Sequence, residues 1–462
     1  MARQLPRRQI LWTGGFAAAG TLLVGLPKSG AAAAAGGAVP AAVPAAVPTF
    51  TPMTAAARVA ARTDRRPVAG GVYDAAVDKT FICWAGKNED TYVQAYDHAA
   101  KTWSRPAKLL GGKGDSHNYP TMVQAADGRL LVFVGMHNAQ LVMARSPQPH
   151  SISGTWSVRN VKEGPAASYP MPFRTASGHI FVFFRETTAE LQSSVPTDTR
   201  RMTYVRSTDN GVTWKSCRQL TGQAFALGST NRPDHVNEVY VGQLRVEPAT
   251  ADRPERVHLV WTIAGGGPGG HTHDAYHKDI YYATFDPAAL SFRAVSGADL
   301  GLQVNDAELD RCRVLLTPLA RPGGLKSPDY IQHAGWLADG RPTLVWITSD
   351  SKAVLHNSAA VWTGSAWQIK EVATGLRTRE MERVGPDTWR VYATREGRPN
   401  IETYLLEAGR NWSAETVIRT PREVQRIELI TGAHDRVRIL ATGNSSGRAV
   451  SIADGDIYVA GA

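Results

Sequence analysis

Residues 207–214 read Ser-Thr-Asp-Asn-Gly-Val-Thr-Trp and carry the most specific fold information in this 462-residue chain. They match the Asp-box hairpin, whose pattern is Ser-x-Asp-x-Gly-x-Thr-Trp. In such a hairpin the aspartate accepts hydrogen bonds from turn amides, the glycine adopts a positive φ angle, and the tryptophan packs on the two strands. The motif is typical of a β-propeller blade. We therefore expect a blade at this position and a structural role for the motif.

The sequence on both sides of this hairpin repeats a similar unit about every 40 to 55 residues. Each unit has an apolar strand rich in Val, Ile, Phe and Trp, a polar bend, a second strand, and often a later Trp. Seven units can be counted, with a turn and strand at residues 79–84, 127–134, 177–184, 256–261, 339–346, 387–392 and 435–440. Helical spacing of apolar residues is almost absent. The sequence predicts an all-β fold, a seven-bladed β-propeller, with a two-domain β-sandwich assembly as the alternative.

The N-terminal residues have the pattern of an export signal. A twin arginine at residues 7–8 precedes a short apolar stretch and an alanine- and proline-rich run that ends at Pro48. This pattern is typical of a bacterial twin-arginine signal with a cleavage region near residues 31–35. A membrane anchor is the alternative, but glycines interrupt the short apolar stretch. We expect residues 1–48 to be signal and linker, residues 49–462 to form the catalytic propeller, and the mature protein to be secreted without a membrane contact.

Composition and charge restrict the class of partner. The chain is 43% hydrophobic and 20% charged, as expected for an ordinary globular protein. The formal net charge is +10, and residues 1–45 hold four basic residues and no acidic one, which leaves +6 without them (10 minus 4). This charge suits an acidic polysaccharide or oligosaccharide as substrate, and it equally suits plain solubility. No long basic run is present, so we expect no nucleic acid partner, and we expect a monomer.

Six polar side chains lie at the edges of strand-like segments in two neighbouring units. They are His117, Asn118, His137, Asn138, Tyr169 and Arg185. The two His-Asn pairs flank the first strands of one unit, and Tyr169 and Arg185 hold the equivalent positions in the next unit. Neighbouring strands therefore direct all six toward one polar pocket suited to an anionic substrate. Each residue alone has an ordinary structural explanation, because polar side chains at strand bends often bind backbone groups.

The order of these residues resembles a known family. His-Asn-x-Pro at residue 117, Gly-x-His-Asn at residue 135, Tyr-Pro-x-Pro at residue 169 and the strand-closing Arg185 are similar to the BNR-4 group of seven-bladed propellers. That group includes polysaccharide lyases that cleave rhamnose–uronate linkages, such as ulvan lyases and rhamnosyl-glucuronate lyases. The resemblance covers roughly residues 70 to 350 and weakens after that. It implies a β-elimination with a histidine base and a tyrosine acid.

The chemistry of such a lyase defines what the pocket must supply. Removing the C5 proton of a uronate requires neutralisation of the adjacent carboxylate, a base at C5, and a proton for the departing O4. Arg185 suits the carboxylate, because a guanidinium can form two parallel hydrogen bonds with it. His137, Asn118 and Asn138 are expected to share this task.

The residues alone leave more than one assignment of the proton-transfer groups. We expect His117 to act as base and Tyr169 as acid, with Tyr240 at the start of the next unit as a further member of the site. A single tyrosine that performs both transfers is chemically possible if Arg185 lowers its pKa. The choice between His117 and Tyr169 for either role stays open.

A second group of residues has the donor types of a metal site. His271, His273 and His277 lie close together in sequence, and Cys312 and His333 follow. Imidazoles and a thiol suit zinc, and relatives of the resembled group carry a structural metal. We expect His277, Cys312 and His333 as ligands of a structural zinc or calcium ion, and no organic cofactor. Cys312 can equally be a small buried hydrophobe, and the chain's three cysteines indicate no disulfide framework.

Two other functions compete with the lyase. A sialidase-like glycoside hydrolase needs an arginine triad and a Tyr-Glu pair, or two suitably placed carboxylates. Glu186, Asp234 and Glu238 lie near the predicted pocket, but they form no clear pair in the sequence. A non-catalytic carbohydrate-binding propeller would use Trp and Tyr side chains as platforms for sugar rings.

Overall fold

Strands make up nearly all of the regular secondary structure. The computed structural model describes residues 50–63, 66, 69–134, 136–187, 199–267 and 272–461, and the predicted export segment lies outside them. Within these ranges the helical segments are short: η1 (Lys87–Glu89), α2 (Cys217–Thr221) and α3 (Asp306–Cys312). No helix in the described ranges has the length and apolar character needed to cross a membrane.

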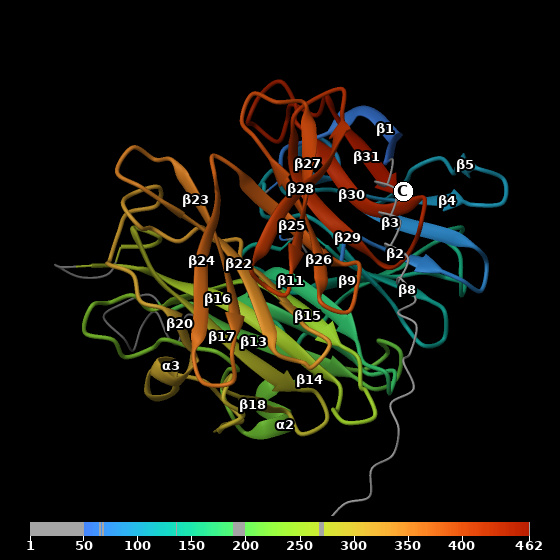
Figure 1. The fold of residues 1–462 in the computed structure, drawn as a ribbon. Coiled ribbons are helices and arrows are strands. Elements are labelled where there is room, and N and C mark those ends of the chain that lie inside the picture. The colour runs from blue at the N-terminus through green and yellow to red at the C-terminus, as the bar shows by residue number, and fades with distance from the viewer. Residues whose placement is uncertain are drawn as a thin grey trace, which may run out of the picture. The chain divides into compact units, whose positions relative to one another are not determined.

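Most strands belong to antiparallel sheets formed by consecutive segments of chain (Figure 1). The first such sheet contains β7 (Thr121–Gln124), β8 (Leu130–Val134), β9 (Val142–Arg145) and β10 (Ser157–Asn160). The second contains β11 (Ala167–Arg174), β12 (Ile180–Glu186), β13 (Arg201–Ser207) and β14 (Lys215–Ser216). The third contains β15 (Glu238–Glu247), β16 (Arg256–Gly265), β17 (Tyr276–Asp286), β18 (Ser291–Arg293), β19 (Asp299–Gly301) and β20 (Arg313–Leu315).

Two further four-stranded sheets follow along the chain. One contains β21 (His333–Trp336), β22 (Pro342–Ser349), β23 (Leu355–Trp362) and β24 (Trp367–Thr374). The other contains β25 (Arg377–Arg383), β26 (Thr388–Thr394), β27 (Asn400–Glu407) and β28 (Asn411–Arg419).

A nine-stranded sheet joins the first described strands to the last ones. Its members are β1 (Thr51–Ala60), β31 (Gly455–Gly461), β30 (Val437–Gly443), β29 (Val424–His434), β2 (Gly71–Asp74), β3 (Lys79–Ala85), β4 (Thr91–Asp97), β5 (Thr102–Trp103) and β6 (Ala107–Leu110). β1 pairs with β31 in antiparallel register, whereas β2 pairs with β29 in parallel. Figure 1 shows blue β1 beside red β31. The chain therefore closes on itself.

The seven strands predicted from the repeat are all present. They are β3, β8, β12, β16, β22, β26 and β30. Apolar side chains on the two faces of each strand pack on different neighbours, because successive residues of a strand point to opposite faces. Val132 of β8 packs in a cluster with Phe81 of β3, and Phe133 packs in a cluster with Val182 of β12. Stacked sheets of this kind give a nearly all-β, propeller-like architecture.

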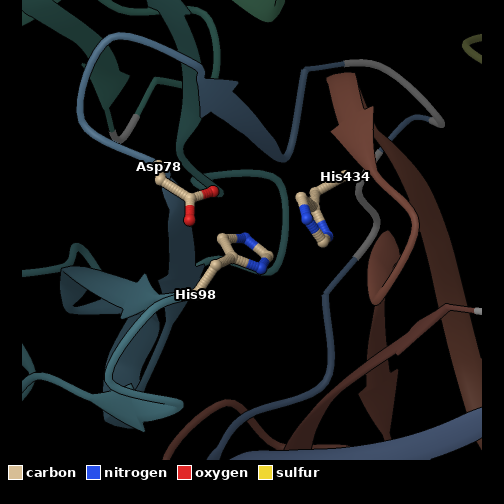
Figure 2. A group of neighbouring side chains, drawn as sticks. All are labelled: Asp78, His98 and His434. Atoms are coloured by element: carbon tan, nitrogen blue, oxygen red, sulfur yellow. The ribbon is translucent and has the colours of Figure 1, made fainter.

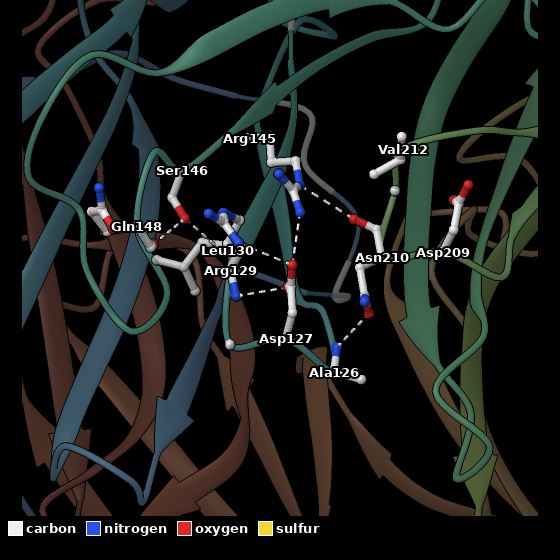
Figure 3. Close-up of polar contacts among 12 residues, drawn as sticks. Ala126, Asp127, Arg129, Leu130, Arg145, Ser146, Gln148, Asp209, Asn210 and Val212 are labelled. Carbon is white, nitrogen blue, oxygen red and sulfur yellow. Dashed lines mark hydrogen bonds and ion pairs between the residues drawn. The ribbon is translucent and has the colours of Figure 1, made fainter.

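The hairpin at residues 207–214 fastens one sheet to the preceding one. Asp209 accepts hydrogen bonds from the backbone N–H and the hydroxyl of Thr213, at 2.8 and 2.6 Å. The Asn210 side chain accepts a bond from the Ala126 amide at 3.1 Å, and the Arg145 guanidinium donates to the Asn210 carbonyl (Figure 3). Trp214 is buried and meets the Phe133 ring edge-on at 5.8 Å. These contacts are structural.

Candidate active site

A cavity of about 770 Å³ opens where several sheets bring the same end of their strands together. Four of the residues predicted from the sequence line it: His117, His137, Tyr169 and Tyr240. They come from the loop before β7, the loop after β8, and the beginnings of β11 and β15. Because the strands of each sheet are antiparallel, the start of one strand and the end of the next meet at the same edge. The cavity thus collects residues that lie far apart in sequence.

Asp115 holds the two imidazoles in place. Its carboxylate oxygens lie 2.5 Å from His117 Nδ1 and 2.7 Å from His137 Nδ1. The two rings stack with their centroids 4.1 Å apart. Burial opposes the charged carboxylate, but hydrogen bonds from the His117 backbone and from both imidazoles lower the pKa of Asp115 to about 2. An ionised Asp115 accepts from both Nδ1 atoms, so each Nε2 atom is left with a lone pair.

The two histidines differ in their surroundings. Burial lowers the pKa of His137, and the nearby His117 and Arg185 lower it further, while Asp115 opposes these effects. His137 is therefore neutral near pH 7, which suits an acceptor of hydrogen bonds. Both imidazoles face the Tyr169 ring, whose centroid lies 5.7 Å from that of His117 and 6.3 Å from that of His137.

Tyr169 is held in an unusual backbone conformation. Its φ angle is +58°, and it lies in β11 where the pairing with β12 shifts register between Ser168 and Met171. A bulky residue with positive φ is rare, and it is retained where the surrounding structure fixes it. Such outliers concentrate at functional positions. The bulge places the Tyr169 side chain on the cavity wall.

Arg185 lies behind this wall rather than on it. The side chain is 1% exposed, and its guanidinium carbon lies 4.7 Å from the Tyr169 ring centroid and 4.8 Å from that of Tyr240. Its three guanidinium nitrogens have no hydrogen-bond partner in the described part of the chain. The direct contact of Arg185 with a substrate carboxylate that the sequence analysis expects does not fit this position, because the side chain is buried against two tyrosine rings and is not among the residues that line the cavity.

The charge of Arg185 is nevertheless maintained. Burial lowers the pKa of Arg185, but Tyr240, Tyr169 and Glu238 more than offset this and raise it above its ordinary value. A buried cation beside two phenols stabilises negative charge on either of them. Arg185 thus places a buried positive charge next to both tyrosine rings.

Arg66 supplies a guanidinium that does line the cavity. It is only 4% exposed, and its guanidinium carbon lies 4.6 Å from the Tyr169 ring centroid. Its Nη1 donates to the Tyr330 carbonyl at 3.1 Å, and its Nε is buried with no partner among the described residues. A partly satisfied, buried guanidinium at a cavity wall is suited to bind a carboxylate. Of the two arginines next to the Tyr169 ring, Arg66 lines the cavity and Arg185 does not.

Tyr240 belongs to a buried hydrogen-bond chain. Its hydroxyl donates to Glu238 Oε2 at 3.2 Å, and His273 Nδ1 lies 2.8 Å from Glu238 Oε1. Burial raises the pKa of Tyr240 well above its ordinary value, and Arg185 only partly opposes this. Tyr240 therefore remains a protonated phenol. His273, considered in the sequence as part of a metal cluster, lines the same cavity as Tyr240 instead.

The two asparagines have structural contacts. Asn138 has a φ angle of +50°, its backbone N–H donates to Ser168 Oγ at 2.8 Å, and its side-chain oxygen accepts from the same hydroxyl at 3.2 Å. Asn118 is 2% exposed. Neither residue lines the cavity. Their expected contact with substrate is not supported by this geometry, whereas Asn138 clearly joins the His137 loop to the strand that carries Tyr169.

The structure does not bring the predicted metal ligands together. His277 uses its ring nitrogens on the Pro328 carbonyl at 2.9 Å and on Asp274 at 3.1 Å, while Cys312 lies in an apolar cluster. His333 is buried in β21, with neither ring nitrogen in a hydrogen bond within the described ranges. In those ranges the three residues form no group of adjacent ligand atoms. His271 lies outside the described residues.

Two other groups have adjacent donor atoms. The first is Asp115 with His117 and His137. The second is Asp78 in the turn between β2 and β3, His98 just after β4, and His434 at the end of β29 (Figure 2). Within each group the ligand atoms lie within 4.8 Å of one another. In the second group His98 Nε2 lies 2.8 Å from Thr80 Oγ1, and His434 Nδ1 accepts from the Arg436 amide at 3.2 Å. Nitrogen-rich groups of this kind suit zinc better than calcium.

Comparison with known proteins gives consistent results. A family model described as "BNR repeat-containing family member" matches residues 79–374. An ulvan lyase of Alteromonas sp. (strain LOR) is 24% identical over 273 residues, which are 53% of this chain and 53% of that relative. The chain thus spans about half the length of this curated relative.

Solved structures extend the similarity over more of the chain. The structure of a PL25 polysaccharide lyase, an ulvan lyase, has a TM-score of 0.66 at 19% identity and covers 88% of this chain and 94% of that one. The same type of enzyme bound to GlcA(1-4)Rha3S has a TM-score of 0.65 at 18% identity, with 88% and 95% covered. These similarities show that the fold is shared.

Proposed function

Since the chain belongs to the BNR repeat-containing family, whose model matches residues 79–374, we propose that it is a polysaccharide lyase acting by β-elimination on a rhamnose–uronate linkage. The observation that carries this proposal is the imidazole pair bridged by Asp115 and facing Tyr169, beside the guanidinium of Arg66. This arrangement contains a base, an acid and a carboxylate-binding cation. An acidic polysaccharide containing glucuronate or iduronate is the substrate that fits these three groups.

The proposed reaction has three coupled parts. Arg66 binds the C6 carboxylate of the uronate and reduces the charge that would oppose loss of the C5 proton. His117 takes that proton on Nε2, because Asp115 holds its other nitrogen protonated and stabilises the imidazolium that forms. As the C4–O4 bond breaks, Tyr169 gives its phenolic proton to O4, and the electrons of the C5–H bond become the C4–C5 double bond.

Arg185 is a positioning residue in this scheme. It lies against Tyr169 and Tyr240 and stabilises the tyrosinate that Tyr169 becomes after donating its proton. His137 accepts hydrogen bonds from the substrate as a neutral imidazole, and Tyr240, whose O–H donates to Glu238, accepts a hydrogen bond from a sugar hydroxyl. Tyr169 as the base is the alternative assignment, in which case His117 is the acid.

Hydrolysis finds less support in the cavity. The carboxylates that line it are Asp274, Asp329, Glu396 and Glu423. Asp329 is paired with Arg377, and Asp274 bonds to Tyr330 and His277. A glycosidase needs one carboxyl group kept protonated opposite a free carboxylate. Elimination by the histidine and tyrosine groups therefore remains the better explanation.

The test is incubation of the mature protein with glucuronate–rhamnose polymers while ultraviolet absorbance of the unsaturated uronate and new reducing ends are both recorded. Elimination produces both signals. His117→Ala should lower kcat by about 10² to 10⁴, the usual contribution of a general acid or base. His179→Ala is the matched control, because His179 lies at the opposite end of the hairpin formed by β11 and β12. Reducing ends without absorbance, or binding without any product, would overturn the proposal.

Several finer features belong to the same proposal. Division of the nine-stranded sheet at its parallel β2–β29 contact gives two groups of strands, which with the other five sheets would make seven blades. We propose that residues 1–48 direct export by the twin-arginine route, and that the mature enzyme is a monomer. We also propose a structural zinc ion, but not with His277, Cys312 and His333 as its ligands, because these residues do not lie together. Metal analysis of the purified protein tests that last point.

A further inference from the structure

Asp78, His98 and His434 form a group, called the closure cluster below, that is separate from the active-site cavity. Their ligand atoms lie within 4.8 Å of one another, and Figure 2 shows the His98 ring between the Asp78 carboxylate and the His434 ring. None of the three residues lines the cavity that contains Tyr169. The closure cluster therefore needs an explanation that is independent of the proposed reaction.

His98 is the fixed member of the closure cluster. It is 6% exposed, and its Nε2 lies 2.8 Å from the Thr80 hydroxyl. Its Nδ1 is buried and has no hydrogen-bond partner within the described ranges. A buried nitrogen without a partner is costly unless a ligand binds it. A neutral ring that donates from Nε2 to Thr80 carries a lone pair on Nδ1, and metal-bound histidines are held by an outer partner in the same way.

Asp78 and His434 are both more exposed than His98, so they can move toward an ion more easily. The Tyr73 hydroxyl donates to Asp78 Oδ1 at 3.0 Å, so Oδ2 is the oxygen offered to an ion. The Arg436 amide donates to His434 Nδ1 at 3.2 Å, but Arg436 is exposed and water can accept from this amide instead. Zinc bonds of about 2.0 to 2.1 Å place tetrahedral ligand atoms roughly 3.3 Å apart. The three ligand atoms therefore need to approach one another by about 1.5 Å at most.

The closure cluster connects the beginning of the described chain to a strand near its end. His98 and His434 are 336 residues apart (434 minus 98). The parallel contact of β2 with β29 pairs Gly71 with Ile430 and Val72 with Thr431. All three cysteines of the chain are buried and free, so no disulfide fastens this junction. A cross-link that closes so long a stretch of chain stabilises the folded state.

We propose that the closure cluster binds one zinc ion and that this ion fastens the first strands of the chain to β29. The protein ligands are Asp78 Oδ2, His98 Nδ1 and a ring nitrogen of His434, and water is the fourth ligand. Zinc accepts two imidazoles and a carboxylate together with a water molecule. The inference gives a location to the structural zinc ion of the proposed function, and it does not depend on the elimination reaction.

The test uses the mature protein after removal of metal by a chelator, with Zn²⁺ alone added back. Calorimetric titration should show an ion that is bound by the wild type and whose Kd is weakened more than about a hundredfold in His434→Ala, since loss of a ligand exceeds the effect of an outer-shell change. His137→Ala is the matched control. It removes a histidine from the group around Asp115 and should keep the ion of the closure cluster. Co²⁺ in place of zinc should give the visible absorption of a tetrahedral ion in wild type and His137→Ala, and not in His434→Ala.

Two further measurements separate a bound ion from a cross-link that stabilises the fold. Thr80→Val removes only the outer partner of His98 and should weaken the Kd for zinc by about 10- to 100-fold. Zinc at about one hundred times its Kd should lower the unfolding equilibrium constant about a hundredfold in wild type and His137→Ala. The same zinc concentration should leave the urea midpoint of His434→Ala unchanged.

Three results would overturn the proposal. The first is the absence of zinc binding by the wild type, or equal zinc affinity in wild type, Asp78→Asn and His434→Ala. The second is loss of the ion in His137→Ala but not in His434→Ala, which would place the ion in the active-site cavity. The third is a bound ion that does not shift the urea midpoint of the wild type. Since no measurement here uses the unsaturated product, failure of the proposed lyase function would leave these results unchanged.

Discussion

Replacing Asp115 by Asn tests whether one carboxylate organises both imidazoles. The side chain keeps its size but loses its charge, and its amide can accept from only one of the two Nδ1 atoms while its NH₂ group faces the other. One histidine must then adopt the opposite tautomer, with its proton on Nε2. If that histidine is His117, the base is lost; in either case the imidazolium formed during the reaction loses its counter-charge.

The size of the effect follows from the geometry. An imidazolium about 4 Å from a carboxylate is stabilised by about 4 kcal/mol at an effective dielectric constant of about 20. Asp115 is 38% exposed, so solvent screens part of this interaction. We therefore expect kcat to fall by about 10² to 10³. KM should change by less than about threefold, since Asp115 does not line the cavity.

The assay is initial-rate measurement of unsaturated product between pH 5 and 9, approximately the range in which histidine titrates. Loss of the negative charge should also move the acidic limb of kcat/KM to lower pH, because a neutral partner stabilises the imidazolium less. Asp127→Asn is the control: Asp127 pairs with Arg129 and Arg145 in the turn between β7 and β8, away from the cavity (Figure 3). Wild-type kcat with an unchanged pH profile in Asp115→Asn would refute the reasoning.

Two predictions concern stability. Gly211→Ala should lower the free energy of unfolding by about 2 to 4 kcal/mol and leave KM unchanged, because Gly211 has a φ of +81° and a Cβ would lie 2.6 Å from Leu131; an unaltered urea midpoint would contradict this. Burial lowers the pKa of His258 to about 4 and that of His333 to about 3. The unfolded chain therefore takes up protons first as pH falls below about 6.5, and each histidine should cost about 1.4 kcal/mol of stability per pH unit. Urea unfolding at pH 7.5 and 5.5 measures the loss, and His333→Phe should reduce it; an identical loss in both proteins would exclude this contribution.

The strands were predictable because their signal is local. Alternating and continuous apolar runs identify β3, β8, β12 and their counterparts without knowledge of their neighbours. The joining of β1 to β31 and of β2 to β29 was not predicted, because strands that are separated by most of the chain carry no local sign that they pair.

The site was predictable where residues recur at equivalent positions of neighbouring units. This rule placed His117, His137, Tyr169 and Tyr240 on one cavity. It failed for Arg66, which lines the cavity but lies before the first unit. It also placed the Arg185 guanidinium on the cavity wall, because a strand-end position does not reveal that the side chain is buried against the rings of Tyr169 and Tyr240. The sequence analysis also missed Asp115 as the residue that contacts both imidazoles. Its position two residues before His117 could have indicated this role.

The pairing of Thr51–Ala60 with Gly455–Gly461 has a consequence for biosynthesis. A ribosome delivers the N-terminal strand early, but its partner emerges only after some four hundred further residues. Until then the nascent protein presents two open sheet edges, which invite association with other chains. Pairing between such distant strands is slow, so we expect the pairing of β1 with β31 to be the last step of folding. A chaperone that covers the unpaired edge of β1 should therefore increase the yield of soluble protein.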